Sequence, residues 1–186
     1  MLFWDAADAV LENVERFARR IRDDEVEFDR VLATVLFTDI VDSTAQSAAM
    51  GDRAWTEIRG QHDQIVRANL GRFRGRQIKT MGDGFLATFD GPARGSAARR
   101  RSRRVSSRSA SRSGLHTGEV ALDGDDVAGL GVAIGARVGA KAGASEVLVS
   151  QTVKDVVAGS GLTFEDAGEH ELKGIPDRWR LYRVLG

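Results

Sequence analysis

A nearly continuous run of apolar and β-branched residues, Val31 to Phe37, is followed almost at once by an acidic residue, Asp39. A run of this kind, without polar alternation, is typical of a central strand that is buried on both faces of a sheet. Asp39 would then stand at or just past the end of that strand. This places a carboxylate at the edge of a buried sheet, and the rest of the chain has to be built around that arrangement.

The residues after Asp39 suggest what the carboxylate could hold. Ser43 and Thr44 follow within five positions, where the chain opens onto a helical pattern. The amides of a helix N-terminus attract phosphate oxygens, and a carboxylate attracts a metal ion. We therefore expect this stretch to hold a metal ion and a polyphosphate together.

A second carboxylate, Asp83, lies in a predicted hairpin over residues 77–89, at the turn Gly82-Asp83-Gly84. Taken alone, this motif reads more readily as an ordinary Asp-Gly turn. If Asp83 lies beside Asp39, the two carboxylates could bind two divalent ions, and hard oxygen ligands favour Mg²⁺ or Mn²⁺. Two such ions serve phosphoryl and nucleotidyl transfer.

The remaining patterns predict an α+β sandwich, with helices over one mainly antiparallel sheet. A helix is expected over residues 52–73, and His62 on it is interpreted as a helix-face histidine and not as a ligand. Further strands are expected at residues 114–122, 146–150, 162–164 and 179–184, and helices at 127–142 and 152–158. The small residues of 127–142 would let that helix pack very close to the sheet.

We divide the chain into an N-terminal helix and connector, 1–30, and one domain, 31–186. Within residues 3–21, apolar residues recur at alternating spacings of four and three, which is the pattern of a helix with a coiled-coil seam. Such a helix could pack on its own domain, or it could pair two chains. The seam is too short to dimerise without help from the domain behind it.

Composition excludes several classes of protein. Formal net charge is zero, there is no cysteine, and no apolar run approaches the length of a membrane span. The absence of cysteine excludes disulfides and thiol catalysis and fits a reducing compartment. The N-terminus has no basic region and is not a signal peptide. We expect a cytoplasmic protein without a membrane span.

Residues 94–113 stand apart from the rest of the chain. They contain eight arginines and no acidic residue, and Val105 is their single aliphatic residue larger than alanine. This composition predicts a disordered or weakly structured segment. A nucleic-acid-binding arm is a weaker interpretation because no aromatic residues are interleaved for stacking. We expect no nucleic-acid partner.

Several motifs occur in a fixed order along the chain and together resemble the class III nucleotide cyclase catalytic domain, particularly of the mycobacterial kind. They are Phe37-Thr-Asp-Ile, Lys79-Thr-Met-Gly-Asp-Gly-Phe, His116-Thr-Gly-Glu, Asp126-Val-Ala-Gly with Gly135-Ala-Arg137, and Leu172-Lys-Gly. The resemblance covers about residues 31–184. It implies the ferredoxin-like fold of that family and the conversion of ATP to cyclic AMP and pyrophosphate, by attack of the ribose 3′-oxygen on the α-phosphorus.

The resemblance also assigns roles to single residues. Asp39 and Asp83 match the two metal-binding aspartates, with Ile40 placed at the metal as well; Phe37, Thr38, Ser43 and Thr44 are placed at the substrate. Lys79 and Asp126 match the pair that selects adenine, Arg137 the arginine that stabilises the transition state, and Lys173 the lysine that contacts the triphosphate. In this family the sites form between two chains in a head-to-tail dimer. The resemblance implies that one chain gives Asp39 and Asp83 and that the other gives Lys79, Asp126, Arg137 and Lys173.

The chain departs from the family pattern in two places. Four residues before Arg137 the family has a polar residue that orients the ribose, and here that position is Ala133. This opens the alternative of a weakly active or inactive domain that binds nucleotide or a partner. The family also has a core-covering helix and a strand where residues 94–113 stand. We hypothesise that a compensated pair of frameshifts, or a sequencing error, produced this Arg/Ser-rich stretch, and we expect impaired folding of the chain as written. Resequencing the coding DNA tests the first point.

Overall fold

The structure is a computed structural model and describes residues 29–105 and 110–185. The chain divides into two compact units, residues 1–31 and 32–186. Of the first unit only residues 29–31 are described, so the predicted helix over 3–21, and with it the coiled-coil alternative, lies outside the described residues. The fold below is that of the second unit, together with residues 30 and 31, where the first strand begins.

The described elements alternate between strands and helices, as the sequence patterns predict for an α+β fold. In order they are β1 (Arg30–Ile40), α2 (Ser43–Met50), α3 (Asp52–Arg72), β2 (Arg76–Met81), β3 (Gly84–Phe89), α4 (Pro92–Val105), β4 (Ser111–Asp123), β5 (Asp126–Ala128), α5 (Leu130–Lys141), β6 (Val147–Ser150), α6 (Gln151–Val156), β7 (Phe164–Glu171) and β8 (Arg178–Val184). They form one eight-stranded sheet in the order β2-β3-β1-β4-β6-β8-β7, with β5 paired to β4. Most of the pairings are antiparallel, and β4 with β6 is parallel.

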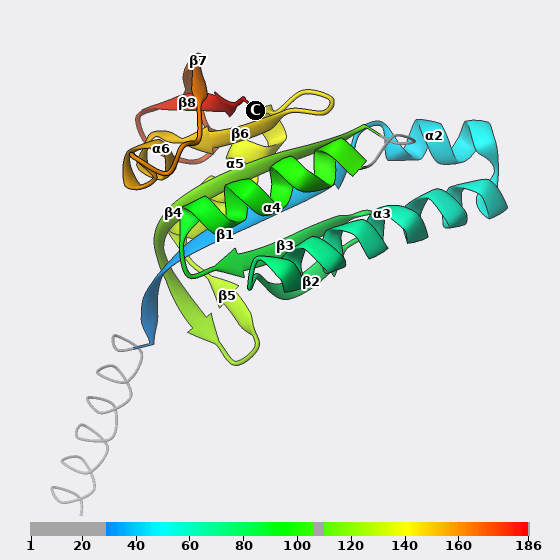
Figure 1. The fold of residues 1–186 in the computed structure, drawn as a ribbon, viewed down its shortest axis with the longest axis horizontal. Coiled ribbons are helices and arrows are strands. Elements are labelled where there is room, and N and C mark those ends of the chain that lie inside the picture. The colour runs from blue at the N-terminus through cyan, green and yellow to red at the C-terminus, as the bar shows by residue number, and fades with distance from the viewer. Residues whose placement is uncertain (1–28, 106–109, 186) are drawn as a thin grey trace, which may run out of the picture. The chain divides into compact units, whose positions relative to one another are not determined.

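The sheet is covered on both faces, which explains why β1 reads as an apolar run. Leu36 packs in a cluster with residues of α3, α4 and α6, whereas its neighbour Val35 faces the opposite side. On that opposite side, Ile134 and Val138 of α5 pack in a second cluster. Figure 1 shows α3 and α4 across one face of the sheet and α5 behind it. The prediction of a central strand buried on both faces is confirmed from Thr34 onward, whereas Val31 and Leu32 are exposed.

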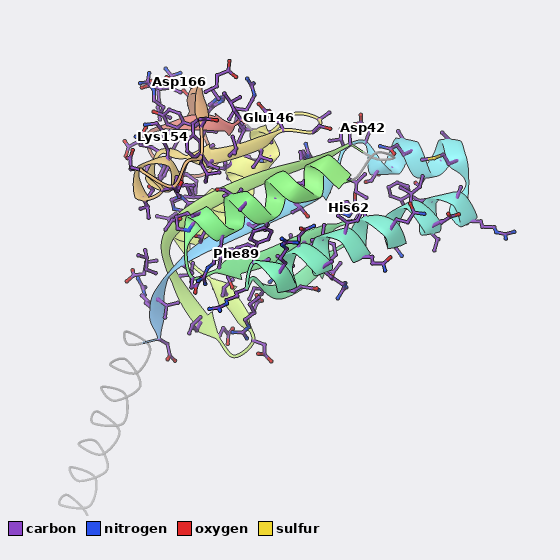
Figure 2. The ribbon with its side chains drawn as sticks, in the orientation of Figure 1. Asp42, His62, Phe89, Glu146, Lys154 and Asp166 are labelled. Carbon is purple, nitrogen blue, oxygen red and sulfur yellow. The ribbon has the colours of Figure 1, made fainter. Side chains whose placement is uncertain are left out.

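The helix predicted over residues 52–73 is α3, and the hairpin predicted over 77–89 is formed by β2 and β3. His62 is only 2% exposed and its ring centroid lies 6.2 Å from that of Phe85. Figure 2 shows His62 on the side of α3 that faces α4. His62 is therefore a core residue, in agreement with its interpretation as a helix-face histidine.

The prediction of disorder for residues 94–113 is wrong over the described part of that segment. Residues up to Val105 belong to α4, and Ser111 begins β4. The first turns of α4 pack so close to the sheet that large apolar side chains are not needed. A Cβ atom added at Gly95 would come within 2.9 Å of Leu115 and 3.2 Å of Phe89, and Ser96 and Ala98 are buried beside it. Alanine and arginine also favour helix locally.

The predicted close packing of the glycine-rich helix is confirmed at α5. A Cβ atom at Gly114 of β4 would stand 2.0 Å from the main-chain nitrogen of Gly139, and one at Gly135 would stand 2.5 Å from Val35. Only glycine permits these backbone approaches. They fix α5 against β1 and β4 at the level of Asp39. In the described part of the chain, no helix is long and apolar enough to cross a membrane.

Candidate active site

Asp39 stands at the end of the central strand, as predicted, and it faces a small cavity. The cavity has a volume of about 210 Å³, and Phe37, Thr38 and Asp39 contribute to its wall from β1. Ala136, Gly139 and Ala140 of α5 line the same cavity, together with Met81, Gly84 and Arg112. The close approach of α5 to the sheet therefore makes this pocket narrow. Thr38 is 3% exposed, and its hydroxyl makes no hydrogen bond with any described residue.

The β2–β3 hairpin brings Asp83 next to the end of β1. Thr38 is paired with Phe85 in the antiparallel ladder, so Asp83, two residues before Phe85, lies in the turn beside the end of β1. Gly84 makes this approach possible, because a Cβ atom there would stand 2.2 Å from the Thr38 carbonyl oxygen. One carboxylate oxygen of Asp83 is buried and makes no hydrogen bond within the described residues. A buried carboxylate oxygen that accepts no hydrogen bond is suited to bind a cation.

These observations fit a divalent metal ion at Asp39 and Asp83. Both side chains offer hard oxygen atoms, which Mg²⁺ and Mn²⁺ prefer. No group of three or more His, Cys, Asp or Glu residues that could hold a metal occurs within residues 29–105 and 110–185, so remaining ligands would have to be main-chain, substrate or water oxygens. Ile40 is 1% exposed and apolar, and its main-chain carbonyl is the one oxygen that it can offer.

The helix start predicted after Asp39 is α2, which begins at Ser43. Asp42, where β1 gives way to α2 (Figure 2), has a left-handed backbone with φ 54°, and its side chain does not cap the helix. The amides of the first helical turn are thus not taken by the Asp42 carboxylate and remain suited to an anion. Ser43 is half-buried and Thr44 is exposed at this turn.

Lys79 and Asp126 form an ion pair at a different place, between β2 and β5. The Lys79 ammonium lies 2.6 Å from one Asp126 oxygen, and both side chains are about half exposed, at 46%. The other Asp126 oxygen accepts a hydrogen bond from the Val127 amide at 2.8 Å. The hydrogen bond from Lys79 is the main reason why the pKa of Asp126 lies below its ordinary value. The two residues assigned to adenine are therefore side by side.

Arg137 and Lys173 meet in a larger pocket of about 870 Å³ between α5 and the β7–β8 loop. Arg137 Nε donates a hydrogen bond of 3.1 Å to the main-chain carbonyl of Lys173. The pocket wall also carries Lys141 and Arg178 against Glu171 and Asp177, so cations outnumber carboxylates. An anionic group would be favoured there.

The sites predicted from the sequence thus fall into three groups on one chain. The described residues that line the 210 Å³ cavity include Asp39 but none of Asp83, Lys79, Asp126, Arg137 and Lys173. Ala140 borders both the small and the large pocket. Ala133 is exposed one helical turn before Arg137 on the same face of α5, and its methyl group offers no hydrogen bond.

One charged residue of the site was missed in the sequence. Arg112 of β4 contacts Asp39 through two nitrogen atoms, at 2.7 and 3.0 Å from the same carboxylate oxygen. It lies in the Arg/Ser-rich segment, where its charge could not be told apart from seven other arginines. The signal that could have found it is the period of two in a strand. Ser111 and Ser113 are buried on one face of β4, so Arg112 between them points to the other face.

Comparison with known proteins agrees with this architecture. Two solved structures share the fold at low sequence identity. The adenylyl cyclase CyaB from P. aeruginosa aligns with a TM-score of 0.72 and 21% identity, covering 84% of this chain and 95% of CyaB. A dimeric guanylyl cyclase domain of the RhoGC fusion protein from Blastocladiella emersonii aligns with a TM-score of 0.73 and 19% identity, covering 84% and 98%.

Sequence comparison gives the family. Over 157 residues the chain is 26% identical to a Rhizobium meliloti (strain 1021) protein named "Putative adenylate cyclase 3", a match that covers 78% of this chain. The chain spans 27%, about a quarter, of the length of that relative. The sequence profile of the adenylate and guanylate cyclase catalytic domain matches residues 26–186. This match covers most of the chain and shows that the chain belongs to the adenylate and guanylate cyclase catalytic domain family.

Proposed function

We propose that this domain is an adenylate cyclase, which converts ATP to 3′,5′-cyclic AMP and pyrophosphate. The observation that carries the choice of base is the Lys79–Asp126 pair, in which one donor and one acceptor lie 2.6 Å apart. Adenine presents an acceptor at N1 and a donor at its exocyclic amine, so Lys79 and Asp126 can each pair with one of them. Guanine presents the reverse pattern at the same two atoms.

The cost of binding the wrong base follows from unpaired polar groups. Each group left without a partner in a closed pocket costs about 1–3 kcal/mol, which corresponds to a factor of about 5 to 150 in affinity. ATP is therefore the better substrate, even though both cyclase classes share this fold. Lys79→Met should reduce the preference for ATP over GTP, whereas Lys154→Met on α6 should leave it unchanged.

Asp39 and Asp83 hold the cations, with Ile40 contributing its carbonyl. When bound, the two divalent ions would lower the pKa of the attacking hydroxyl and gather the triphosphate. Ser43, Thr44 and the first amides of α2 contact phosphate oxygens, and Phe37 and Thr38 shape the wall beside them. The bond from the ribose 3′-oxygen to the α-phosphorus forms as the bond to the leaving pyrophosphate breaks, and the hydroxyl proton passes to solvent.

Arg137 stabilises the charge that develops at the α-phosphate, and Lys173 contacts the triphosphate. The guanidinium is held in position by its hydrogen bond to the Lys173 carbonyl, at 3.1 Å. Such preorganised donors typically contribute about 10²–10³ in turnover. The cationic character of the 870 Å³ pocket, with Lys141 and Arg178 nearby, supports this assignment.

A head-to-tail homodimer would complete the site. The cavity at Asp39 holds about 210 Å³, whereas pockets that enclose a ligand of nucleotide size run from about 300 to 1,000 Å³. One chain therefore does not enclose ATP at its metal aspartates. A second copy that brings Lys79, Asp126, Arg137 and Lys173 over this cavity would supply the missing wall, and an isolated monomer would be inactive.

The second candidate is a cyclase domain that binds nucleotide with weak turnover or none. Ala133 favours it, because the exposed face of α5 that carries Arg137 has a methyl group where a ribose contact is expected. Cyclic AMP formation from ATP and Mn²⁺, measured for the purified chain and for Asp39→Ala, separates the two. Product that is lost in Asp39→Ala supports the cyclase, whereas tight nucleotide binding without product supports the second candidate.

A further inference from the structure

The ion pair between Arg112 and Asp39 occupies an atom that the proposed function needs for a metal ion. Two guanidinium nitrogens, Nε at 3.0 Å and Nη2 at 2.7 Å, donate to the same Oδ2 atom of Asp39. The two side chains are 37% and 38% exposed, and both line the 210 Å³ cavity. A single carboxylate oxygen that accepts two such bonds has little capacity left for a cation.

The neighbours of Arg112 hold it in this position. Ser111 and Ser113, one residue to either side, are buried on the opposite face of β4, where Arg99 donates to the hydroxyl group of each. The period of two in a strand then directs Arg112 to the face of Asp39. Gly114, two residues after Arg112, lies against α5. This part of β4 therefore cannot shift without separating the strand from that helix.

We propose that Arg112 acts as an internal counter-ion that competes with the divalent cation for Asp39. This inference rests on the proposed function, because it takes Asp39 to be a metal ligand. A cation on Asp39 would stand within a few ångströms of the guanidinium, and like charges at that distance repel. The cation and Arg112 therefore occupy Asp39 alternately, and the protein without nucleotide binds divalent ions weakly.

The competition makes cation and nucleotide binding depend on each other. An arriving triphosphate brings anionic oxygens that can take over the guanidinium while its cation takes the carboxylate. Each ligand then removes an obstacle to the other, and such coupling is reciprocal by thermodynamic necessity. The site would favour loading the ion and the nucleotide together, and it would bind ions more weakly when no nucleotide is present.

The test is Mn²⁺ binding by the full chain without nucleotide, followed by electron paramagnetic resonance of the free ion. Arg112→Met should bind Mn²⁺ about three- to tenfold more tightly than the unmodified chain, as expected for a half-exposed pair. Arg112→Lys, which keeps the charge but not the paired contact, should give an intermediate affinity. Adding Asp39→Asn to Arg112→Met should abolish the gain, and Lys154→Met serves as the matched control.

Each other result overturns a stated part of the reasoning. If Arg112→Met binds Mn²⁺ no more tightly than the unmodified chain, while Asp39→Asn weakens binding in both, the metal site stands and the competition is refuted. If Asp39→Asn leaves binding unchanged in both, or neither protein binds Mn²⁺, the metal site of the proposed function fails and the competition fails with it. Far-ultraviolet circular dichroism of each variant verifies that the fold is retained, and Arg112→Lys provides the comparison if Arg112→Met does not fold.

Discussion

His116 should make the stability of this domain depend on pH. Its side chain is 4% exposed in β4, where Nδ1 lies 2.8 Å from the Ser150 hydroxyl oxygen and the ring meets Trp179 edge-on at 5.6 Å. These contacts suit a neutral imidazole, and they place no carboxylate against the ring. Burial alone lowers the pKa of His116 from 6.5 to about 4.

The size and the direction of the effect follow from that pKa. In the unfolded chain His116 takes up a proton near pH 6.5, and in the folded chain it does so only near pH 4. Between these values the unfolded state binds more protons, so acid favours unfolding. The pKa difference corresponds to about 3 kcal/mol, since each pKa unit is worth about 1.4 kcal/mol. This loss begins as the pH falls below about 6.5 and is complete below about 4.

Urea unfolding followed by circular dichroism between pH 7 and pH 4 measures the effect. The pKa of His62 is also lowered, chiefly by burial, so the unmodified chain alone does not isolate His116. His116→Gln removes one titrating group and keeps an amide that can bond to Ser150. The free energy of unfolding of the unmodified chain, minus that of His116→Gln, should fall by about 3 kcal/mol across this range. A difference that stays constant with pH would refute the reasoning.

Three further outcomes are expected. Ala133→Asn should raise the rate of cyclic AMP formation, by up to about 10²-fold if the ribose contact is the missing donor, and an unchanged rate would argue that this position is not at the ribose. Arg99→Leu, with its two serine partners changed to valine, should stabilise the domain by about 1–4 kcal/mol in urea unfolding, because a buried cation is replaced by apolar packing; a loss of stability would contradict this. Asp39→Ala and Arg137→Ala should each be inactive alone, but the two variants refolded together should recover about a quarter of the activity of the unmodified dimer. Half of the dimers are then mixed, and each mixed dimer has one intact site of two; no recovery would argue against sites shared between chains.

The fold was largely predictable because its main elements carry local patterns. The run before Asp39 has no polar alternation, and the structure shows β1 with Val35 on one face and Leu36 on the other. The turn at Gly82 has φ 65°, as a hairpin glycine should. The small residues of α5 predicted close packing, and Gly139 lies against Gly114. In each case the local chemistry and the tertiary environment require the same residue type.

The segment at residues 94–113 was mispredicted because the search for hydrophobic periodicity detects a helix or strand only where large apolar residues recur. The beginning of α4 needs little bulk, since Gly95 already lies against Leu115 and Phe89. Arg99 also differs from the hydrophobic pattern that predicts buried positions, because it is an arginine and yet only 2% exposed. Its Nε and Nη2 atoms donate to Ser113 and Ser111 across the helix–strand contact. A buried polar network of this kind has no signature in hydrophobic patterning.

The motifs name the residues of the candidate site one by one, and those assignments stay predictions; which of these residues lie together was not predictable from the motifs. Motifs located Asp39, Lys79 and Arg137, whereas only the fold places them in separate regions of one chain. The cavity beside Asp39, at about 210 Å³, is smaller than a nucleotide requires, and Arg112 already occupies part of it. Both facts agree with the proposed shared site, in which a cation, a nucleotide and a second chain would complete this half. In the proposed dimer, regulation would act through the pairing of the chains, because neither chain alone would supply all the residues of a site.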